Sequence, residues 1–267
     1  MSDNKEWYKL IFKQIQPIHI GFGSYGVVNE TRIFIPGWTM WGALTKAYNL
    51  ENGEDLSKNQ DLFDNISCFY PCFDREGGNI LFPNFKDNKF YIGNYSEDEF
   101  RAKFVDTFIS TAINPATNTA LKESLNEINV ILPGVKSDYL ENDYERQLYW
   151  VGIAALTEEI KSNLPKEIYI GGDARYGLGK MILVKSKNSF QELLSEWKEK
   201  DGILRNYLAI EQGNNKTVKG KIELLVEITN SWEGAELSVD EKGFCFMPGT
   251  QLLINVQNFT LKKGILI

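Results

Sequence analysis

Apolar and polar residues alternate imperfectly over the first part of the chain. Residues 7–20 and 27–35 are rich in β-branched and aromatic residues, which predicts two strands. Glycines crowd residues 21–26 between them, so a turn-rich loop is expected there. After the second strand, Thr39 predicts the N-cap of a helix that covers residues 41–48.

The middle of the chain predicts a projecting hairpin and its strongest helix. Two extended runs flank a polar centre within residues 108–132, as expected for a long arm. Ser96 and Glu99 have the spacing of a capping box and predict a short helix at residues 96–104. Residues 144–164 carry apolar side chains near helical spacing, which predicts a helix.

The last hundred residues alternate between ordered and linker-like patterns. The segments expected are strands at 168–170 and 181–184 around a glycine-rich loop, a helix at 190–200, a linker at 201–219, and a β-rich stretch from 220 to 267.

Composition and charge narrow the function classes. The chain has 267 residues, 43% hydrophobic and 24% charged, as in an ordinary globular protein. Its formal net charge is −7, which argues against a free-standing nucleic-acid binder. Residues 161–187 carry six Lys or Arg against two acidic residues, so any RNA contact is expected near that segment.

The cysteines and the N-terminus indicate a cytoplasmic protein without a cofactor. Met1 is followed by polar residues rather than an apolar signal core, and no apolar run is long enough to span a bilayer. Three cysteines, Cys68, Cys72 and Cys245, suit reduced thiols. With His19 as the single histidine, no zinc site and no other metal or cofactor is expected.

Two glycine-rich segments resemble nucleotide-binding motifs only superficially. Residues 21–28 match G-x-G-x-x-G-x-V, but a strand pattern follows where a dinucleotide site needs a helix. Residues 171–180 have Ala174 where a P-loop needs glycine, and Met181 follows the lysine. The second segment suits either close approach of a backbone phosphate or a glycine-rich bulge with solvated charges.

Taken in order, these segments resemble the RAMP superfamily of CRISPR-associated proteins. The resemblance rests on Pro17-Ile-His-Ile-Gly-Phe-Gly, on Arg32-Ile-Phe-Ile-Pro-Gly-Trp-Thr-Met-Trp-Gly-Ala-Leu, and on the glycines of residues 171–179. A weaker block, residues 111–134, resembles the thumb of the type III branch. The blocks together span residues 17–181, and the last 80 or so residues add nothing to the match.

The resemblance implies an α+β fold with a ferredoxin-like core of the RNA-recognition-motif type. It places an RNA-binding domain at residues 1–190, a thumb-like insertion around 108–134, and a β-rich extension at 191–267. It also implies binding of a guide RNA beside other RAMP-type CRISPR subunits and an effector nuclease, with no membrane contact. The residues expected to contact RNA are His19, Gly21, Arg32, Thr39, Trp41, Lys46, Asn114, Thr117, Gly171, Gly172, Arg175, Gly177, Gly179 and Lys180.

Departures from the family pattern shape the expected role. Target-cleaving subunits of this branch carry an aspartate in the thumb where this chain has Asn114, and asparagine is no general base. The chain most resembles the subunit that caps the 5′ handle of the guide in type III-D and type VII-like complexes, so a non-catalytic role is expected. Three alternatives stay open: a repeated backbone subunit, a guide-processing endoribonuclease that uses His19, and a protein-interaction subunit without RNA contact.

Overall fold

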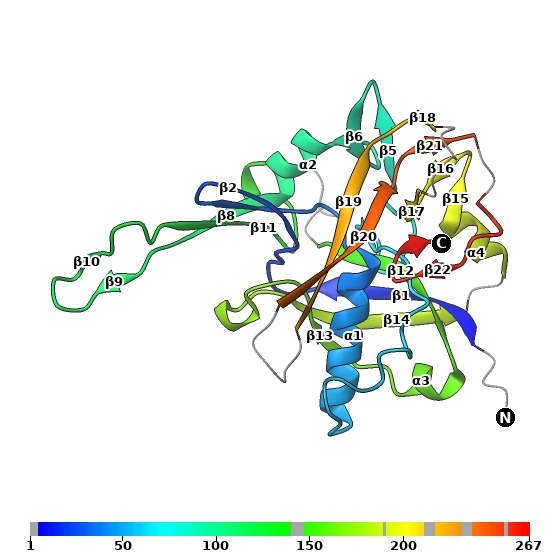
Figure 1. Cartoon of the computed structure of the whole chain (residues 1–267), viewed down its shortest axis with the longest axis horizontal. Coiled ribbons are helices and arrows are strands. Elements are labelled where there is room, and N and C mark those ends of the chain that lie inside the picture. The colour runs from blue at the N-terminus through cyan, green and yellow to red at the C-terminus, as the bar shows by residue number, and fades with distance from the viewer. Residues whose placement is uncertain (1–4, 140–146, 189–190, 211–216, 231–236, 254–255) are drawn as a thin grey trace.

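The computed structural model describes residues 5–139, 147–188, 191–210, 217–230, 237–253 and 256–267, and Figure 1 shows a main body from which one long hairpin projects. The architecture is mixed α+β and rich in sheet. None of the helices formed by the described residues has the length and apolar character needed to cross a bilayer.

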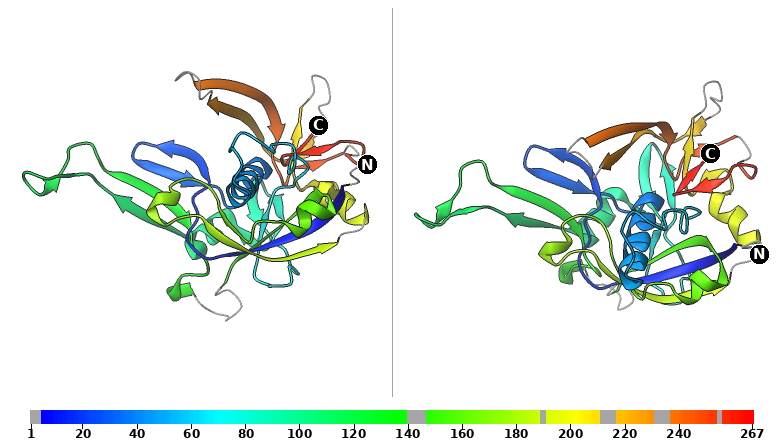
Figure 2. Two further views of the ribbon diagram at one scale, coloured as in Figure 1. Left: turned by 90° about the horizontal axis from the view of Figure 1, so that it is seen from below. Right: turned by 60° about the horizontal axis from the view of Figure 1, so that its bottom comes forward.

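The central sheet has the strand order β13-β14-β1-β12-β4, and each of its neighbouring pairs is antiparallel. These strands are β1 (Glu6–Gln14), β4 (Tyr70–Cys72), β12 (Tyr149–Leu156), β13 (Glu167–Tyr169) and β14 (Lys180–Asn188). Along the chain, helix α1 (Gly37–Glu51) directly precedes β4, and α3 (Glu158–Ser162) follows β12. Figure 2 shows α1 on one side of the sheet, where its Met40 and Leu44 are buried in the main core.

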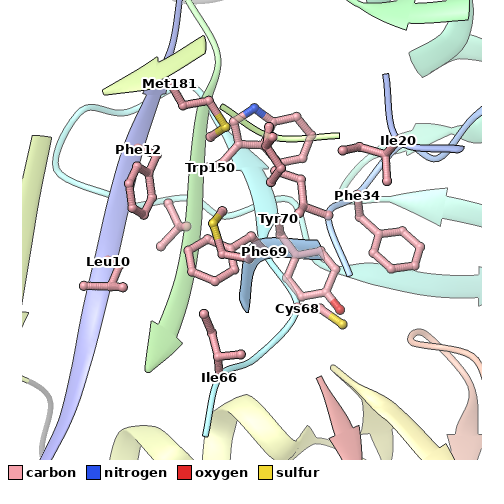
Figure 3. Close-up of a cluster of buried hydrophobic side chains, with 14 of the residues drawn as sticks. Leu10, Phe12, Ile20, Phe34, Ile66, Cys68, Phe69, Tyr70, Trp150 and Met181 are labelled. Carbon is pink, nitrogen blue, oxygen red and sulfur yellow. The ribbon is translucent and has the colours of Figure 1, made fainter. Parts of the chain in front are cut away.

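Large side chains from different strands fill that core. Figure 3 shows Phe12, Phe69 and Trp150 in one cluster, all fully buried. The Trp150 indole donates a hydrogen bond of 2.9 Å to Gln14 Oε1, and Gln14 Nε2 donates to the Ile131 carbonyl at 2.7 Å. Burial of each large apolar side chain contributes roughly 1.5–3 kcal/mol to the stability of the fold. The buried polar atoms of Gln14 and Trp150 are hydrogen-bonded, so their burial is compensated.

The helix predicted for residues 144–164 is wrong. Residues 149–156 form β12, and only residues 158–162 are helical; residues 140–146 lie outside the described part. Strand β12 is a central strand, between β1 and β4, and almost all of its side chains are buried on the two faces of the sheet. A strand covered on both faces shows a continuous apolar run instead of alternation, and such a run is easily taken for a helix.

The predicted long hairpin is present and projects from the body (Figure 1). We call residues 105–131 the arm. Its strands are β8 (Val105–Ser110), β9 (Ile113–Asn114), β10 (Thr119–Ala120) and β11 (Asn126–Ile131). At its base, β11 pairs with β8 and with β3 (Val28–Thr31), and β3 pairs with β2 (Gly21–Tyr25). The segment predicted as a loop at 21–26 is therefore mostly strand, with the turn at Gly26.

Of the two predicted helix N-termini, one is confirmed and the other is wrong. Helix α2 (Glu97–Phe104) begins with the predicted capping box between Ser96 and Glu99. Helix α1 begins at Gly37 after Pro36, without a side-chain cap, so Thr39 lies inside the first turn and its predicted N-cap role is wrong. The sheet that precedes α2 contains β5 (Pro83–Lys86), β6 (Lys89–Ile92) and β7 (Tyr95–Ser96), and short 3₁₀ turns occur at Ser137–Tyr139 and Ala174–Tyr176.

The C-terminal part is β-rich, as predicted, and its helix α4 (Gln191–Lys198) is also present. Its sheets have the orders β19-β20-β17-β23-β22 and β15-β16-β21-β18. The strands are β15 (Glu199–Lys200), β16 (Ile203–Leu204), β17 (Tyr207–Ala209), β18 (Thr217–Lys219), β19 (Ile222–Asn230), β20 (Leu237–Phe246), β21 (Gln251–Leu252), β22 (Leu261–Lys262) and β23 (Ile265–Leu266).

The linker predicted for residues 201–219 is wrong, because β16 and β17 lie within it and Tyr207 is fully buried. Trp197 and Tyr207 belong to the same hydrophobic core as the central sheet. The two parts predicted on either side of residue 190 therefore share one core, and their division into domains stays a prediction.

Candidate nucleic-acid interface

Residues 17–20 lie between the base of the arm and a second segment, residues 171–180, which we call the glycine loop. On one side, the Gly172 and Gly179 amides donate to the carbonyls of His19 and Pro17 at 3.1 and 2.9 Å. On the other side, Ile18 and Ile131 exchange backbone hydrogen bonds of 3.0 and 2.8 Å. The His19 ring completes the junction, with Nδ1 2.8 Å from the Asn129 carbonyl oxygen.

Close packing explains two of the loop glycines. A Cβ at Gly171 would lie 2.0 Å from the His19 carbonyl oxygen, and Gly171 has φ +76°. A Cβ at Gly179 would lie 2.4 Å from the Ile170 carbonyl oxygen. Only glycine tolerates such approach together with positive φ. Leu178, between them, is buried against Ile128 and Val130 of β11, so the loop is fixed to the arm.

The outer part of the glycine loop presents Arg175 and Tyr176 to solvent. Both lie in the 3₁₀ turn, and within the described part of the chain Arg175 has no ion pair. Its guanidinium carbon is 5.8 Å from the Tyr176 ring centroid, and Tyr176 is 59% exposed. An unpaired arginine beside an exposed ring suits a phosphate and its neighbouring base.

Neighbouring carboxylates neutralise much of the basic segment that the sequence singled out. Lys180 pairs with Glu167 at 2.7 Å, and this hydrogen bond raises the lysine's pKa and lowers the glutamate's. Lys161 pairs with Glu158, and Lys185 with Glu76. The local excess of Lys and Arg is therefore smaller in the structure than in the sequence, and among the described residues of this segment Arg175 and Lys166 are the cations left without an ion pair.

The backbone amide of Arg32 donates to the Ile20 carbonyl at 2.7 Å, beside the junction, but its side chain lies in a largely buried cluster. It forms a two-pronged ion pair with Glu223, and its Nη1 also donates to the Tyr207 hydroxyl at 3.1 Å. Tyr207 in turn donates to Glu223 at 3.0 Å. Burial lowers the pKa of Arg32, but the charges and hydrogen bonds of Tyr207 and Glu223 outweigh it and the pKa is raised overall.

Of the three expected residues on α1, Trp41 has its contacts outside the glycine loop. The Trp41 indole donates to the Gln60 carbonyl at 2.7 Å, and Lys263 Nζ lies 3.6 Å from its ring centroid, so one face of this ring is covered. Thr39 is half-buried in the first turn, and Lys46 is exposed.

The remaining expected residues divide between the junction and the tip of the arm. Gly21 lies beside His19, since a Cβ there would be 3.9 Å from His19 Nε2. Asn114 and Thr117 lie at the tip of the arm, remote from the glycine loop (Figure 1). There the Asn114 side chain accepts a hydrogen bond from the Ala116 amide at 2.9 Å.

The sequence reasoning missed exposed aromatic residues around the junction. Besides Tyr176, they are Phe22 and Tyr25 on β2, which are 43% and 68% exposed. Their signal was present in the sequence, because each stands within a glycine-rich segment. The Arg32 guanidinium carbon lies 4.8 Å from the Phe22 ring centroid, so one face of that ring is covered. Aromatic rings in such positions make platforms for bases.

The single histidine and the three cysteines are buried. His19 is 9% exposed and packs beneath the glycine loop. Burial raises the pKa of Cys68 to about 12 and the pKa values of Cys72 and Cys245 to about 11, so these thiols stay protonated near neutral pH. Among the described residues, no cluster of three or more His, Cys, Asp or Glu could hold a metal ion.

Known structures share this fold. Residues covering 91% of the chain superpose on 85% of a chain from "Type III-B Cmr-beta bound to cognate target RNA and AMPPnP, state 1", with a TM-score of 0.64 and 13% identity. A chain of Cmr-beta bound to cognate target RNA gives a TM-score of 0.63 at 12% identity, over 91% of this chain and 86% of that one. No protein-family model and no curated protein matches the sequence.

Proposed function

We propose that this chain is a non-catalytic RNA-binding subunit of a CRISPR effector complex, and that it holds the 5′ handle of the guide. The observation that carries the proposal is the fold shared with chains of type III-B complexes that were solved with bound target RNA, over nine-tenths of this chain. The sequence blocks that resemble the RAMP superfamily support the same assignment, because they do not depend on the fold.

The core of this subunit is ferredoxin-like in our proposal. Strands β1, β4, β12 and β14 follow one another along the chain, and in the sheet they take the order fourth-first-third-second with every pair antiparallel. Helix α1 lies between the first two strands and α3 between the last two. This order of strands and helices, β-α-β followed by β-α-β, is that of the ferredoxin-like fold.

The RNA surface is the glycine loop together with the base of the arm. Arg175 and Tyr176 offer a forked cation and an aromatic face next to each other. Leu178 and the amides of Gly172 and Gly179 anchor the loop, so its backbone needs little ordering when Arg175 and Tyr176 bind a ligand. The arm is the thumb of this subunit.

The same arm would contact a neighbouring subunit. Its exposed apolar side chains are Phe108, Ile109, Ile113, Leu121 and Leu125. Apolar side chains in such number on a thin hairpin have no core of their own to enter, and protein or nucleic-acid partners bury surfaces of this kind. The acidic charge of the whole chain is then compatible with RNA binding, because the phosphate contact is confined to one loop.

The absence of catalysis in the proposal follows from two residues. His19 is covered by the glycine loop and its Nδ1 is engaged by the Asn129 carbonyl, which leaves little room for a substrate atom. Asn114, at the arm tip, has an amide where a carboxylate would be needed to bind a metal or accept a proton.

Arg175→Ala tests the proposal, with the exposed Arg75→Ala as the matched control. We expect Arg175→Ala to weaken binding of a guide-length RNA by roughly 1–3 kcal/mol, equally for unrelated sequences, because phosphates carry no base identity. The slope of log affinity against log salt should become shallower by somewhat under one unit. Arg75→Ala should change neither quantity, and the bound RNA should be recovered intact. An unchanged affinity and salt slope in a folded Arg175→Ala protein would contradict the proposal.

A further inference from the structure

Strands β19 and β20 form a long hairpin with an open edge. They pair antiparallel over residues 222–230 and 237–246, and Figure 2 shows the hairpin projecting from the body. In their sheet β19 is the edge strand, and the short strand β17 pairs with β20 at Phe246 and Cys245. Among the strands that the structure describes, the part of the hairpin beyond Phe244 therefore has two strands. A two-stranded hairpin is only marginally stable in water without a further strand or a cover.

One hydrogen bond at the start of the hairpin fixes the direction of the backbone groups of β19. The Met247 amide donates to the Lys221 carbonyl at 2.9 Å, so the backbone of Lys221 is turned toward β20. Backbone groups alternate in direction along an antiparallel strand, so those of Ile222 and Leu224 are turned to the open edge. Residues 222–230 contain neither lysine nor proline, which natural edge strands use to prevent pairing with another chain. The edge of β19 is therefore a ready template for an additional strand.

The same hairpin exposes apolar side chains on one face. Ile222, Leu224 and Phe244, the residue that pairs with Leu224, are 56%, 42% and 60% exposed. The opposite face is covered at this point, because Leu225 and Cys245 are buried in the main core. In the sequence of β19, apolar residues occupy every second position from 222 to 228. An added strand with apolar residues at alternate positions would extend the exposed face beside Leu224.

The charge of the hairpin limits which strand can be added. Residues 222–246 contain six acidic residues and one lysine. Arg32 neutralises Glu223, which still leaves a clear excess of negative charge. An RNA strand would be repelled by this excess, and so would the same hairpin of a second copy. A protein segment that carries Lys or Arg between its apolar residues would be attracted instead.

We propose that β19 pairs with an extended segment of a partner protein in which apolar residues alternate with Lys or Arg. The segment joins the hairpin as a third strand and forms backbone hydrogen bonds with Ile222 and Leu224. In this mode of recognition the main-chain bonds supply affinity, and the alternating side chains decide which segment fits. The edge shares no residue with the glycine loop or the arm, so the inference goes beyond the proposed function and is tested separately from it.

An NMR titration of the whole chain with a peptide tests the pairing. The probe is a capped peptide of alternating lysine and valine with the length of β19, and a second peptide has glutamate in place of lysine. The chain carries isotope-labelled leucine, and the Leu224 amide signal is assigned by its loss in Leu224→Lys. We expect a saturable shift of this signal with the lysine peptide, and affinity for the glutamate peptide weaker on the order of tenfold.

Hydrogen exchange distinguishes strand pairing from attraction of charge alone. At saturation with the lysine peptide, exchange of the outward-facing Leu224 amide should slow about tenfold, because a bound strand gives it a hydrogen-bond partner. The Leu225 amide faces β20 by the same alternation, so its exchange should stay unchanged. A shift of the Leu224 signal without slower exchange would overturn the proposed pairing.

Two variants provide the matched controls. Leu224→Lys places a cation at an exposed position on the open edge, so it should abolish saturable binding of the lysine peptide while the thermal unfolding temperature stays nearly unchanged. Leu50→Lys introduces the same charge at an exposed position near the end of α1, and it should bind the peptide as the native chain does.

The remaining outcomes would overturn the proposal in different ways. The lack of any saturable shift at Leu224 would show that the edge accepts no strand, and equal binding of the glutamate peptide would exclude a basic partner. Protection of the Leu224 amide by guide-length RNA would assign the edge to RNA. Protection that rises with the concentration of the free chain would assign it to a second copy.

Discussion

Arg32 and Arg175 have the same side chain but opposite surroundings. Arg175 is exposed on the glycine loop, whereas Arg32 is enclosed by Glu223 and Tyr207. The side chains of Arg32 and Glu223 are 10% and 17% exposed, so both charges are largely removed from water. Such a pair is costly to break from one side, because the remaining charge keeps its desolvation penalty without the attraction that offsets it.

Arg32→Met is therefore expected to lower the free energy of unfolding by roughly 3 kcal/mol, at the low end for buried pairs because some solvent contact remains. The double variant Arg32→Met, Glu223→Met should recover much of that loss, since no charge is left unpaired. Urea denaturation of the single and double variants measures both values. Equal stability of Arg32→Met and the native chain would show that the pair is solvated and that Arg32 is available to a ligand.

The sequence alone could not separate these two arginines. Arg32 stands in a block that resembles an RNA-binding family, and its partner Glu223 is almost two hundred positions further along the chain. Arg175 lies among glycines, which is a local signal, and its contact with RNA stays a prediction. Local patterns thus predicted the loop residues, whereas the neutralisation of Arg32 and Lys180 depends on contacts that only the fold provides.

The same distinction holds for whole elements. The capping box of α2 and the hairpin of the arm depend on neighbouring residues, and both were predicted correctly. The sequence predicts a helix at β12 because the pairing with β1 and β4 and the burial of both faces depend on residues distant in sequence. Gly152 within it shows one such distant contact, because a Cβ there would lie 2.4 Å from the Phe69 ring.

Two glycines of the glycine loop should respond very differently to alanine. Gly177 has φ +81° and open space around it, so Gly177→Ala should cost only the left-handed strain of about 1–2 kcal/mol. Gly171→Ala adds a Cβ 2.0 Å from the His19 carbonyl, so it should cost clearly more and displace residues 17–20. Chemical denaturation gives both costs. Similar losses of stability in the two variants would mean that the glycine loop does not pack on residues 17–20.

The whole molecule is held together across the predicted domain boundary at residue 190. Trp197 stacks on Tyr70 with ring centroids 6.3 Å apart, and Tyr207 packs on Phe34 at 6.1 Å. Truncating a single large buried aromatic side chain typically costs about 3–5 kcal/mol, while whole domains are stable by only about 5–15 kcal/mol. Loss of Trp197 and Tyr207 together is therefore enough to remove most of the stability of the first part.

A fragment of residues 1–190 is accordingly expected not to unfold cooperatively, whereas the full chain should show a single transition by circular dichroism and by tryptophan fluorescence. The fragment would expose the faces of Tyr70 and Phe34 that Trp197 and Tyr207 cover. A control that shortens the arm by removing residues 112–123 deletes only chain that lies outside the core, so it should keep the transition and shift its midpoint little. A cooperative transition in the 1–190 fragment would instead establish the first part as an independent domain and the C-terminal part as an appendage to it.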